Sequence, residues 1–477
     1  MKTFAAGHCP GLDAQTLQWL DLGHRSPNCA GIQVPVLTPD QVRLVTHTVR
    51  QQAALHLRPM PLADIMVRID RAIQLLLQPQ HPARQTLDDF LPRICGLDAD
   101  MVRLHLNRYL KTFRASGLQR FVAEDLPNPW VLDRFQPLAK GGWGQALGPT
   151  QLLHLWAGNV PALPLWSLVC GLLAKAGNVG KLASAEPVFA TVFVQVLIEV
   201  EPRWRDAIAL LWWEGGDLAP EAAACADAQC VIAYGGDDTL RALHSRLPEG
   251  VRWLPHGHKL SFGVLGATAL GTRHGAELAT LAAMEVARHD QGGCYSPHVF
   301  YVQRGGRISP REWAERLFHA LQNQHARHPR RTPDADEAWA LGQWRQTQEW
   351  SGQARLMSGA GGDVAFIDEA RPLTPGPGLR CVQVLAYDDA EQVMAALAPA
   401  RRWLQTAGLA VTPEEWPRWA QSLGLAGVSR VCAIAAMTAP EAGWHHDGGH
   451  SLRDLLSWVE VDASLIQDAE RYAPYAD

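Results

Sequence analysis

Apolar residues near the N-terminus recur at helical spacing, and this pattern predicts two helices. The apolar positions are Ile65, Ile69, Ile73 and Leu76 in one segment and Val102, Leu106, Tyr109, Leu110 and Phe113 in the other. We expect the first helix to begin at Leu62 and to end before Pro79 and Pro82, and Gly117 to end the second. Since the first 60 residues show few regular patterns, residues 1–124 are predicted to form a largely helical region.

Residues 125–150 have a different character, because short apolar pieces alternate with proline and glycine. The pair Gly141-Gly142 provides a turn between two such pieces, which predicts a small β-hairpin arm. A simple linker is the alternative that the sequence leaves open.

Beyond residue 150, short apolar runs alternate with helical patterns, which is typical of a parallel sheet covered by helices. The apolar runs are at 152–156 and 230–234, and the helical patterns are at 165–176 and 187–200. Ligands of such sheets bind at the carboxyl ends of the strands. Three loops are expected there, at Gly158-Asn159, at 181–184 and at Gly235-Gly236, although no GxGxxG sequence is present.

The same alternation continues through the second half of the chain. We expect a turn into a strand at 255–266, a helix at 276–288, a strand at 299–302, and a strand with a following helix at 381–397. Ser309 and Glu312 form a capping box that begins another helix. Residues 323–350 are polar and charged, and they are predicted to be a surface insertion.

Cys294 differs from the other cysteines, because it follows Gly292-Gly293 and precedes the apolar run 299–302. Glycine lets the backbone approach a substrate closely, and loops on rigid strands often hold catalytic residues. The position therefore suits an exposed nucleophile. The alternative is a small apolar filler, since free cysteine is usually buried.

Composition limits the classes of function. The chain has 477 residues, 47% of them hydrophobic and 19% charged, which fits two or three domains with a large core. A net charge of −5 provides no general attraction to nucleic acid or to anionic membranes. The nine cysteines are scattered without a CxxC pair, and the first residues lack the apolar core of a signal peptide. No apolar stretch is long enough for a membrane span, so we expect a cytoplasmic protein.

Six segments of the chain resemble those of one known protein family. They are AGNVPALPLWSLVCGLLAK (157–175), GKLAS (180–184), YGGDD (234–238), GHKLSF (257–262), DQGGCYSP (290–297) and HDGGHSL (446–452). In this order they resemble the bacterial long-chain acyl-CoA reductases of the luciferase-operon type, a branch of the aldehyde dehydrogenase superfamily. The resemblance implies an aldehyde-dehydrogenase-like α/β fold, with a Rossmann-type NADP-binding domain at 151–265 and an α/β catalytic domain at 266–430.

The resemblance also implies where the remaining segments of the chain lie. The N-terminal region 1–124 would pack on the cofactor domain, and the arm at 125–150 would serve oligomerisation. Residues 431–477 would pack back on the core or on a neighbouring subunit.

The resemblance implies two catalytic residues. Cys294 matches the nucleophile that attacks a thioester or aldehyde carbonyl, and Asn159 matches the asparagine of the oxyanion hole. Taken alone, Asn159 would indicate only a turn. Pro255 stands where hydrolytic relatives place the glutamate that activates water, and His256 or His258 could supply a base instead.

Four residues match the cofactor site of the family. Lys181 matches a lysine that contacts the cofactor ribose, and Gly235 and Gly236 match a turn that faces the pyrophosphate. Ser184 stands where NAD-preferring relatives have glutamate, so NADPH is the expected cofactor. Asp237 departs from the serine of the wider superfamily, and its role stays open.

Three histidines near the C-terminus, His445, His446 and His450, suggest a metal site at first sight. The pair Gly448-Gly449 between them disfavours a helix that would align two of them. We therefore expect a structural turn and no metal.

The predicted reaction is the NADPH-dependent reduction of a fatty acyl thioester to the aldehyde through an acyl-Cys294 intermediate. The acyl donor would be acyl-CoA or an acyl-carrier protein. The alternatives are an aldehyde dehydrogenase that works in the oxidative direction and an acyl-accepting scaffold subunit of a fatty acid reductase complex. We also expect a homo-oligomer, and an acyl-protein synthetase subunit as a partner.

Overall fold

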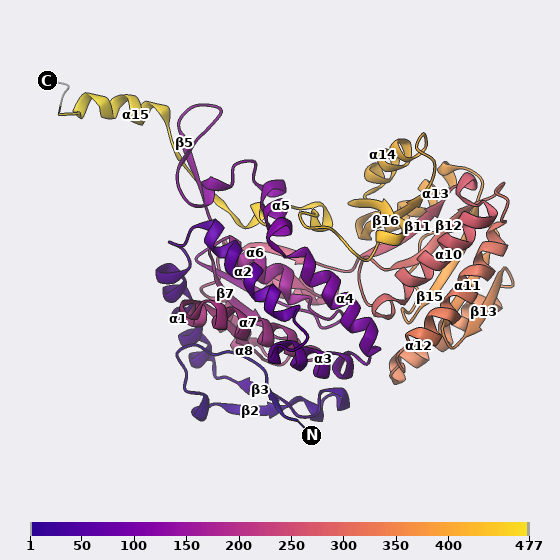
Figure 1. Ribbon diagram of the computed structural model, residues 1–477, viewed down its shortest axis with the longest axis horizontal. Helices are drawn as coiled ribbons and strands as arrows, with labels where there is room; N and C mark the ends of the chain where they lie inside the picture. Colours follow the sequence, from indigo (N-terminus) through magenta and orange to yellow (C-terminus); the bar gives the residue numbers. More distant parts are fainter. Residues whose placement is uncertain (1, 475–477) are drawn as a thin grey trace.

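The computed structural model describes residues 2–474 as two lobes and an arm (Figure 1). The first lobe is built around a five-stranded sheet and the second lobe around a seven-stranded sheet. The arm and the C-terminal helix α15 (Ala463–Ala469) extend from the first lobe at the upper left of the view (Figure 1). Within residues 2–474, none of the helices combines the length and the apolar character that a membrane span requires.

The N-terminal region holds more regular structure than its sequence pattern predicts. It begins with a three-stranded sheet in the order β1-β3-β2. The elements of the region are β1 (Phe4–Ala5), β2 (Gln18–Asp21), β3 (Ile32–Val36), α1 (Pro39–His56), α2 (Leu62–Leu76), α3 (Pro82–Cys95), α4 (Ala99–Thr112) and α5 (Ala115–Asp125). The prediction of a largely helical region is therefore wrong for residues 2–36. These strands have only two to five residues, which is too few for an alternating pattern to appear.

The two helices predicted from apolar stripes are present as α2 and α4, but the second one ends earlier than expected. Gly117 lies inside α5 and does not end α4. A Cβ atom at this position would come within 1.9 Å of the carbonyl oxygen of Thr112. The glycine therefore allows the tight connection between α4 and α5.

The five strands of the first lobe are all parallel and follow the order β10-β9-β6-β7-β8. The strands and their connecting helices are β6 (Gln151–Leu155), α6 (Pro164–Leu173), β7 (Gly177–Lys181), α7 (Val188–Val200), β8 (Ile208–Leu211), α8 (Leu218–Cys225), β9 (Cys230–Tyr234), α9 (Asp237–His244) and β10 (Arg252–His256). The order reverses between β6 and β9, and the loops after these strands flank the point where such sheets bind ligands.

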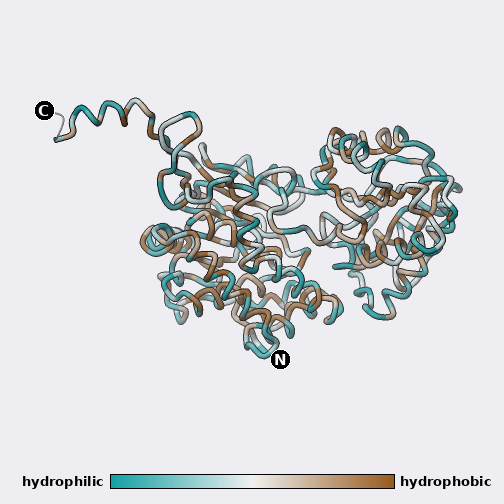
Figure 2. The backbone as a smooth tube through the Cα atoms, turned by 45° about the horizontal axis from the view of Figure 1, so that its top comes forward, coloured by the Kyte–Doolittle hydropathy of each residue, from teal (hydrophilic) through white to brown (hydrophobic). Residues whose placement is uncertain are grey.

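Helices cover both faces of this sheet. On one face α2 and α3 pack against α7, and on the other α1 packs against α8. Figure 2 shows hydrophobic segments concentrated in the interior of this lobe. The N-terminal region is thus part of the first lobe and encloses its sheet.

The sheet of the second lobe follows the order β13-β14-β15-β12-β11-β16-β17, and only β13 is antiparallel to its neighbour. Its elements are β11 (Leu260–Leu265), α10 (Thr272–Ala287), β12 (Pro297–Gln303), α11 (Pro310–Arg327), α12 (Ala335–Trp350), β13 (Ala354–Gly359), β14 (Gly362–Ile367), β15 (Cys381–Tyr387), α13 (Ala390–Leu397), β16 (Leu404–Ala410), α14 (Trp416–Ala426) and β17 (Arg430–Ala433). The capping box of Ser309 and Glu312 begins α11 as predicted. The predicted surface insertion at 323–350 contains the end of α11 and the helix α12, and within α12 only Leu341 and Gln348 are buried.

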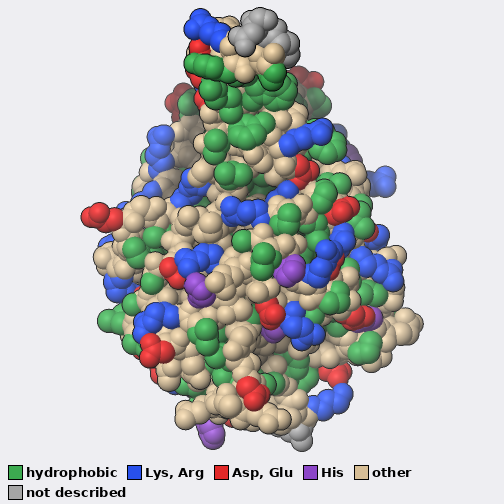
Figure 3. All heavy atoms as spheres, turned by 90° about the vertical axis from the view of Figure 1, so that its left-hand side faces the viewer, with side chains coloured by type: hydrophobic (Ala, Val, Ile, Leu, Met, Phe, Trp, Pro, Cys, Tyr) green, Lys and Arg blue, Asp and Glu red, His purple; other side chains and the backbone are tan. Residues whose placement is uncertain are grey.

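The arm is a hairpin of β4 (Gln136–Pro137) and β5 (Trp143–Leu147). The turn between them contains Gly141 and Gly142, which have positive φ angles of 89° and 73°. The strand β18 (Ser457–Val461) pairs with β5, so the end of the chain completes the arm. Figure 3 shows apolar side chains gathered on the arm, at the top of that view. The expected role in oligomerisation stays a prediction.

Candidate functional site

The nucleophile loop, residues 288–294, connects α10 to β12 and has an unusual backbone. Three consecutive residues other than glycine have positive φ angles of 49°, 49° and 65°, namely His289, Asp290 and Gln291. Such residues adopt the left-handed conformation rarely, at a cost of about 1–3 kcal/mol each. The surroundings of the loop must therefore hold it in this shape.

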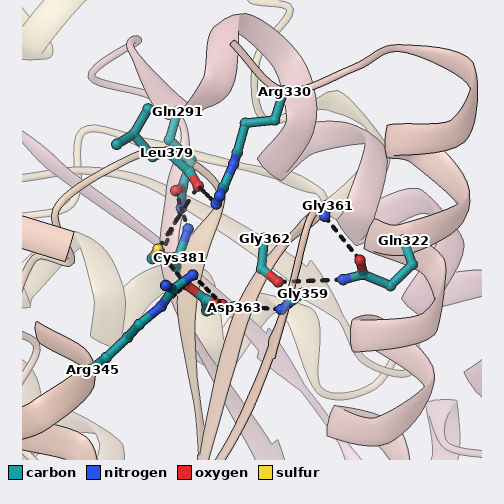
Figure 4. A network of polar contacts seen from close by, with 10 residues as sticks. All are labelled: Gln291, Gln322, Arg330, Arg345, Gly359, Gly361, Gly362, Asp363, Leu379 and Cys381. Carbon is teal, nitrogen blue, oxygen red and sulfur yellow. Dashed lines mark hydrogen bonds and ion pairs between the residues drawn. The ribbon is translucent and has the colours of Figure 1, made fainter. Parts of the chain in front are cut away.

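Buried contacts from the segment before β15 supply that support. Arg380 Nε donates a hydrogen bond to Asp290 Oδ1 at 2.5 Å, and both side chains are fully buried. The amide of Gln291 donates to the carbonyl oxygen of Cys381 at 3.0 Å and accepts from its backbone N–H at 2.7 Å. Figure 4 shows Gln291 beside Leu379 and Cys381. These contacts tie the position of the nucleophile loop to the second sheet.

Cys294 and Asn159 both line a cavity of about 830 Å³. Asn159 Nδ2 donates a hydrogen bond to the carbonyl oxygen of Gly292 at 2.7 Å. A Cβ atom at Gly292 would come within 2.8 Å of the backbone oxygen of Asn159, so only glycine fits between the two loops. The loop after β6 and the nucleophile loop are therefore in direct contact, although they come from different lobes.

The rest of the cavity wall combines aromatic and basic side chains. The aromatic residues are Tyr109, Trp166, Tyr234, Tyr295 and Trp444. The basic residues are Arg108, Lys111, Arg120, Arg288 and Arg430. A chamber of this kind can hold an apolar chain and attract negative charge.

The thiol of Cys294 is protonated near neutral pH. Burial raises its pKa to about 11, and the negative charge of Asp447 acts in the same direction. A hydrogen bond from Gln405 and the backbone N–H groups of the loop lower the pKa and offset part of this shift. If Cys294 is the nucleophile that the sequence predicts, its thiolate must be formed with help from the site.

Lys181 and Ser184, two of the residues predicted to bind the cofactor, follow β7. Lys181 Nζ lies 6.0 Å from the centre of the Trp213 ring, and burial lowers the pKa of this lysine. Ser184 Oγ accepts a hydrogen bond from the indole N–H of Trp212 at 3.0 Å. A hydroxyl that accepts one bond can still donate its own hydrogen to a ligand.

The glycines predicted to face the pyrophosphate form the turn into α9. Gly236 is the residue that precedes the helix, and no described side chain caps the helix there. A Cβ atom at Gly236 would meet no described atom within 4 Å. The first N–H groups of α9 therefore adjoin open space that an anion can enter.

Asp237, whose role the sequence left open, connects the two lobes. Its carboxylate accepts hydrogen bonds from the backbone N–H of His258 at 3.1 Å and from the indole N–H of Trp403 at 3.1 Å. The bond from Trp403 is the main cause that lowers the pKa of Asp237. The charge next to the glycine turn thus faces the second lobe.

The C-terminal histidines divide between two neighbourhoods. His446 stacks on His256 with ring centres 4.3 Å apart and an angle of 8°. His450 Nδ1 lies 3.5 Å from Asp125 Oδ1, and His445 packs edge-on against His450. The possible ligand atoms of His256, His446 and Asp447 lie within 4.8 Å of one another, and so do those of Asp125, His445 and His450. The expected absence of a metal stays a prediction.

Two residues near Cys294 were missed by the sequence analysis. Asp447 Oδ2 lies 2.9 Å from His256 Nδ1, and Asp447 Oδ1 accepts a hydrogen bond from Gln405 Nε2 at 2.7 Å. Asp447 belongs to the quoted HDGGHSL segment, so a signal was present. Gln405 lies within β16 and had no sequence signal. Of the two histidines considered as a base, His256 is the one whose side chain joins this group.

Comparisons with known proteins agree on the family and on the fold. The model of the family Acyl-CoA reductase (LuxC) matches residues 57–458. A long-chain acyl-protein thioester reductase of Photorhabdus luminescens is 23% identical over 444 residues, which cover 90% of this chain and 86% of that protein. Its counterpart in Vibrio harveyi is 23% identical over 379 residues, which cover 78% of this chain and 75% of that protein.

Solved structures of aldehyde dehydrogenases share this fold. Aldehyde dehydrogenase 21 from Physcomitrella patens superposes with a TM-score of 0.76 at 12% identity and covers 97% of this chain and 99% of its own. A NAD-dependent benzaldehyde dehydrogenase from Corynebacterium glutamicum gives a TM-score of 0.71 at 14% identity, with 96% and 98% covered. The α/β, aldehyde-dehydrogenase-like fold that the sequence predicts is confirmed.

Proposed function

The chain belongs to the acyl-CoA reductase (LuxC) family, and we propose that it reduces a long-chain acyl thioester to the aldehyde with NADPH. The observation that supports this most is that Cys294 and Asn159 line the same 830 Å³ cavity, where Asn159 also hydrogen-bonds the loop of Cys294 at Gly292. A nucleophile and an oxyanion donor beside a chamber with aromatic walls suit a substrate with a long apolar chain.

The proposed reaction begins when the Cys294 thiolate attacks the thioester carbonyl. The second amide hydrogen of Asn159 and the backbone N–H of Cys294 would stabilise the negative oxygen that forms. The bond to the donor sulfur then breaks, the donor leaves as a thiol, and the acyl group stays on Cys294. Hydride addition to the acyl carbon gives a thiohemiacetal, which collapses to aldehyde and the free thiolate.

NADPH, when bound, supplies the hydride, and the residues at the edge of the first sheet fit such a ligand. The open turn at Gly235-Gly236 leaves the first N–H groups of α9 free of side-chain caps among the described residues, as a pyrophosphate needs. Lys181 and the hydroxyl of Ser184 would hold the ribose and its 2′-phosphate. A glutamate at position 184 would repel that phosphate, and the serine does not.

The direction of the reaction follows from the residue at position 255. Pro255 has no ionisable group, and its backbone is fixed by pairing of β10 with β9. A water-activating carboxylate is therefore missing at this point, and the acyl-enzyme would wait for hydride or for an incoming thiol. We expect free acid to form slowly from aldehyde and NADP, and rapid release would support the oxidative alternative.

The curated relatives are named for an acyl-protein substrate, and the same class of donor is proposed here alongside acyl-CoA. Arg108 and Lys111 line the cavity from α4 and would attract the phosphates of acyl-CoA or of the phosphopantetheine arm of an acyl-carrier protein. The apolar arm would pair with a second copy of the chain. An acyl-protein synthetase subunit would then supply the acyl group.

The test uses intact mass and a matched pair of cysteines. The protein is mixed with acyl-CoAs of increasing chain length without cofactor, and one acyl adduct is expected per chain. Cys294→Ala should abolish both the adduct and NADPH oxidation. Cys432→Ala is the control, because Cys432 lines the same cavity and should keep both. An adduct that persists in Cys294→Ala would refute the assignment of the nucleophile.

A further inference from the structure

A polar chain joins the nucleophile to three residues that are far apart in the sequence. Gln405 is fully buried in β16, and a hydrogen bond from its side chain lowers the pKa of the Cys294 thiol. Gln405 Nε2 also donates to Asp447 Oδ1 at 2.7 Å. Asp447 Oδ2 in turn lies 2.9 Å from His256 Nδ1. The amide nitrogen of glutamine has two hydrogens, so one group can serve a carboxylate and a sulfur together.

A second contact independently places β16 beside Cys294. The hydroxyl of Ser261 donates to the carbonyl oxygen of Cys294 at 2.8 Å and accepts from the backbone N–H of Thr406 at 3.2 Å. Thr406 follows Gln405 directly, so the backbone next to the amide is bound to the nucleophile loop. The strand that carries Gln405 is therefore linked through Ser261 to the nucleophile loop.

Asp447 is well suited to hold an amide in place. Burial raises its pKa, but the hydrogen bond with His256 and the nearby His446 outweigh this effect and lower the pKa below the usual range. The group is therefore a carboxylate near neutral pH. Its backbone has a positive φ of 55°, a conformation that Asp and Asn adopt more readily than other side chains. The oxygen Oε1 of Gln405 is buried without a partner in the described part of the chain, so Asp447 is what anchors this amide.

We propose that Gln405 is a further catalytic residue, which donates a hydrogen bond to the thiolate of Cys294, and that Asp447, fixed by His256, is the positioning residue that holds Gln405 there. The inference deepens the proposed function, since it takes Cys294 as the nucleophile. A buried thiolate forms before the attack and again when the aldehyde leaves. Without a donor, it would lie beside the negative charge of Asp447 with only backbone N–H groups to stabilise it.

The first experiment measures the thiolate directly and needs neither substrate nor cofactor. Alkylation of Cys294 by iodoacetamide is followed by peptide mass from pH 7 to pH 10 in the full chain. Gln405→Met keeps the length of the side chain but removes the donor. We expect roughly ten- to hundredfold slower alkylation at pH 8, the range for loss of a hydrogen bond to a charged group. An unchanged pH profile would overturn the role of Gln405.

A matched control separates this effect from a general loss of buried polarity. Gln151 is also a fully buried strand glutamine, but it lies at the opposite end of β6 from the Asn159 loop. Gln151→Met should leave the alkylation profile of Cys294 unchanged. A slowing equal to that of Gln405→Met would show that the effect is structural and would overturn the proposal.

A pair of Asp447 variants tests the positioning role and remains informative if Gln405→Met does not fold. Asp447→Asn removes the charge, keeps an oxygen that accepts from Gln405 and tolerates the positive φ. We expect faster alkylation than in the natural protein, because the negative charge near the sulfur is gone. Asp447→Ala removes the acceptor as well, and alkylation should be several-fold slower than in Asp447→Asn. Equal rates in the two variants would overturn the positioning role.

These outcomes are distinguishable from a failure of the proposed function. If Cys294 shows the expected alkylation profiles but takes no acyl adduct, the reductase proposal fails and the contact to Gln405 stands. If the acyl adduct forms on Cys294 but the profiles do not respond to Gln405 or Asp447, the reductase proposal stands and this inference fails.

Discussion

The nucleophile loop and the turn at Gly235-Gly236, which is predicted to bind the cofactor, are both glycine-containing loops at strand ends, yet they are held in different ways. The nucleophile loop has three strained residues and is fixed by the buried ion pair of Asp290 and Arg380. The turn at Gly235-Gly236 has no side-chain cap in the described structure, and little surrounds it. A reacting sulfur must be in position before the substrate arrives, because a small displacement slows the reaction strongly. A binding turn instead needs free N–H groups that the ligand itself will satisfy.

The largest effect is expected from breaking the support of the nucleophile loop. Arg380→Met leaves the carboxylate of Asp290 buried without its charged partner. Loss of one partner from a buried pair costs about 3–5 kcal/mol, so the free energy of unfolding in urea should fall by that amount. The exposed pair of Arg241 and Asp238 provides the control, and Arg241→Met should change the stability by no more than about 1 kcal/mol.

Removing both charges of the Asp290–Arg380 pair tests whether the unpaired carboxylate causes the loss of stability. The double variant of Arg380→Met with Asp290→Asn removes both charges, and it should regain part of the lost stability because no buried carboxylate is left unpaired. A double variant as unstable as the sum of its single changes would mean that the two side chains do not act as a pair.

A smaller effect is expected where the two loops touch. Asn159→Ala removes an amide that donates to the carbonyl oxygen of Gly292. In the proposed reaction the same amide would also donate to the oxyanion. Turnover should fall by roughly 10²- to 10³-fold, as for loss of one oxyanion donor, while KM for the thioester changes little. Steady-state kinetics separate the two quantities. A change in KM alone would show that Asn159 serves only as a turn.

The smallest effect is expected at the cofactor edge, and it should leave the nucleophile untouched. Ser184→Glu places a carboxylate where the 2′-phosphate would bind, and the rate with NADPH relative to NADH should fall by about tenfold or more. Ser184→Ala is the control, because it removes the hydroxyl without adding a charge. Equal use of both cofactors by the natural protein would show that position 184 does not select the cofactor.

Local patterns in the sequence determined the class of the fold and the chemical identity of the loops. The stripe in α2, the capping box at Ser309 and the apolar runs of β6 and β9 all depend on neighbours within a few residues, so the sequence shows them directly. Cys294 and Asn159 were found because ordered motifs accompany them. Short strands such as β1 and strands rich in small residues such as β16 have no such local signal.

Only the tertiary structure decided which side chains meet. Gln405 reaches Cys294 because β16 lies next to β11 in the sheet, and Asp447 reaches His256 because the chain returns to the first lobe after β17. Contacts of this kind are made between residues from about 40 to nearly 200 positions apart, and no periodicity connects them. The sequence therefore predicts a nucleophile, whereas the fold decides which groups surround its sulfur, since electrostatic and hydrogen-bond effects depend on distances in space.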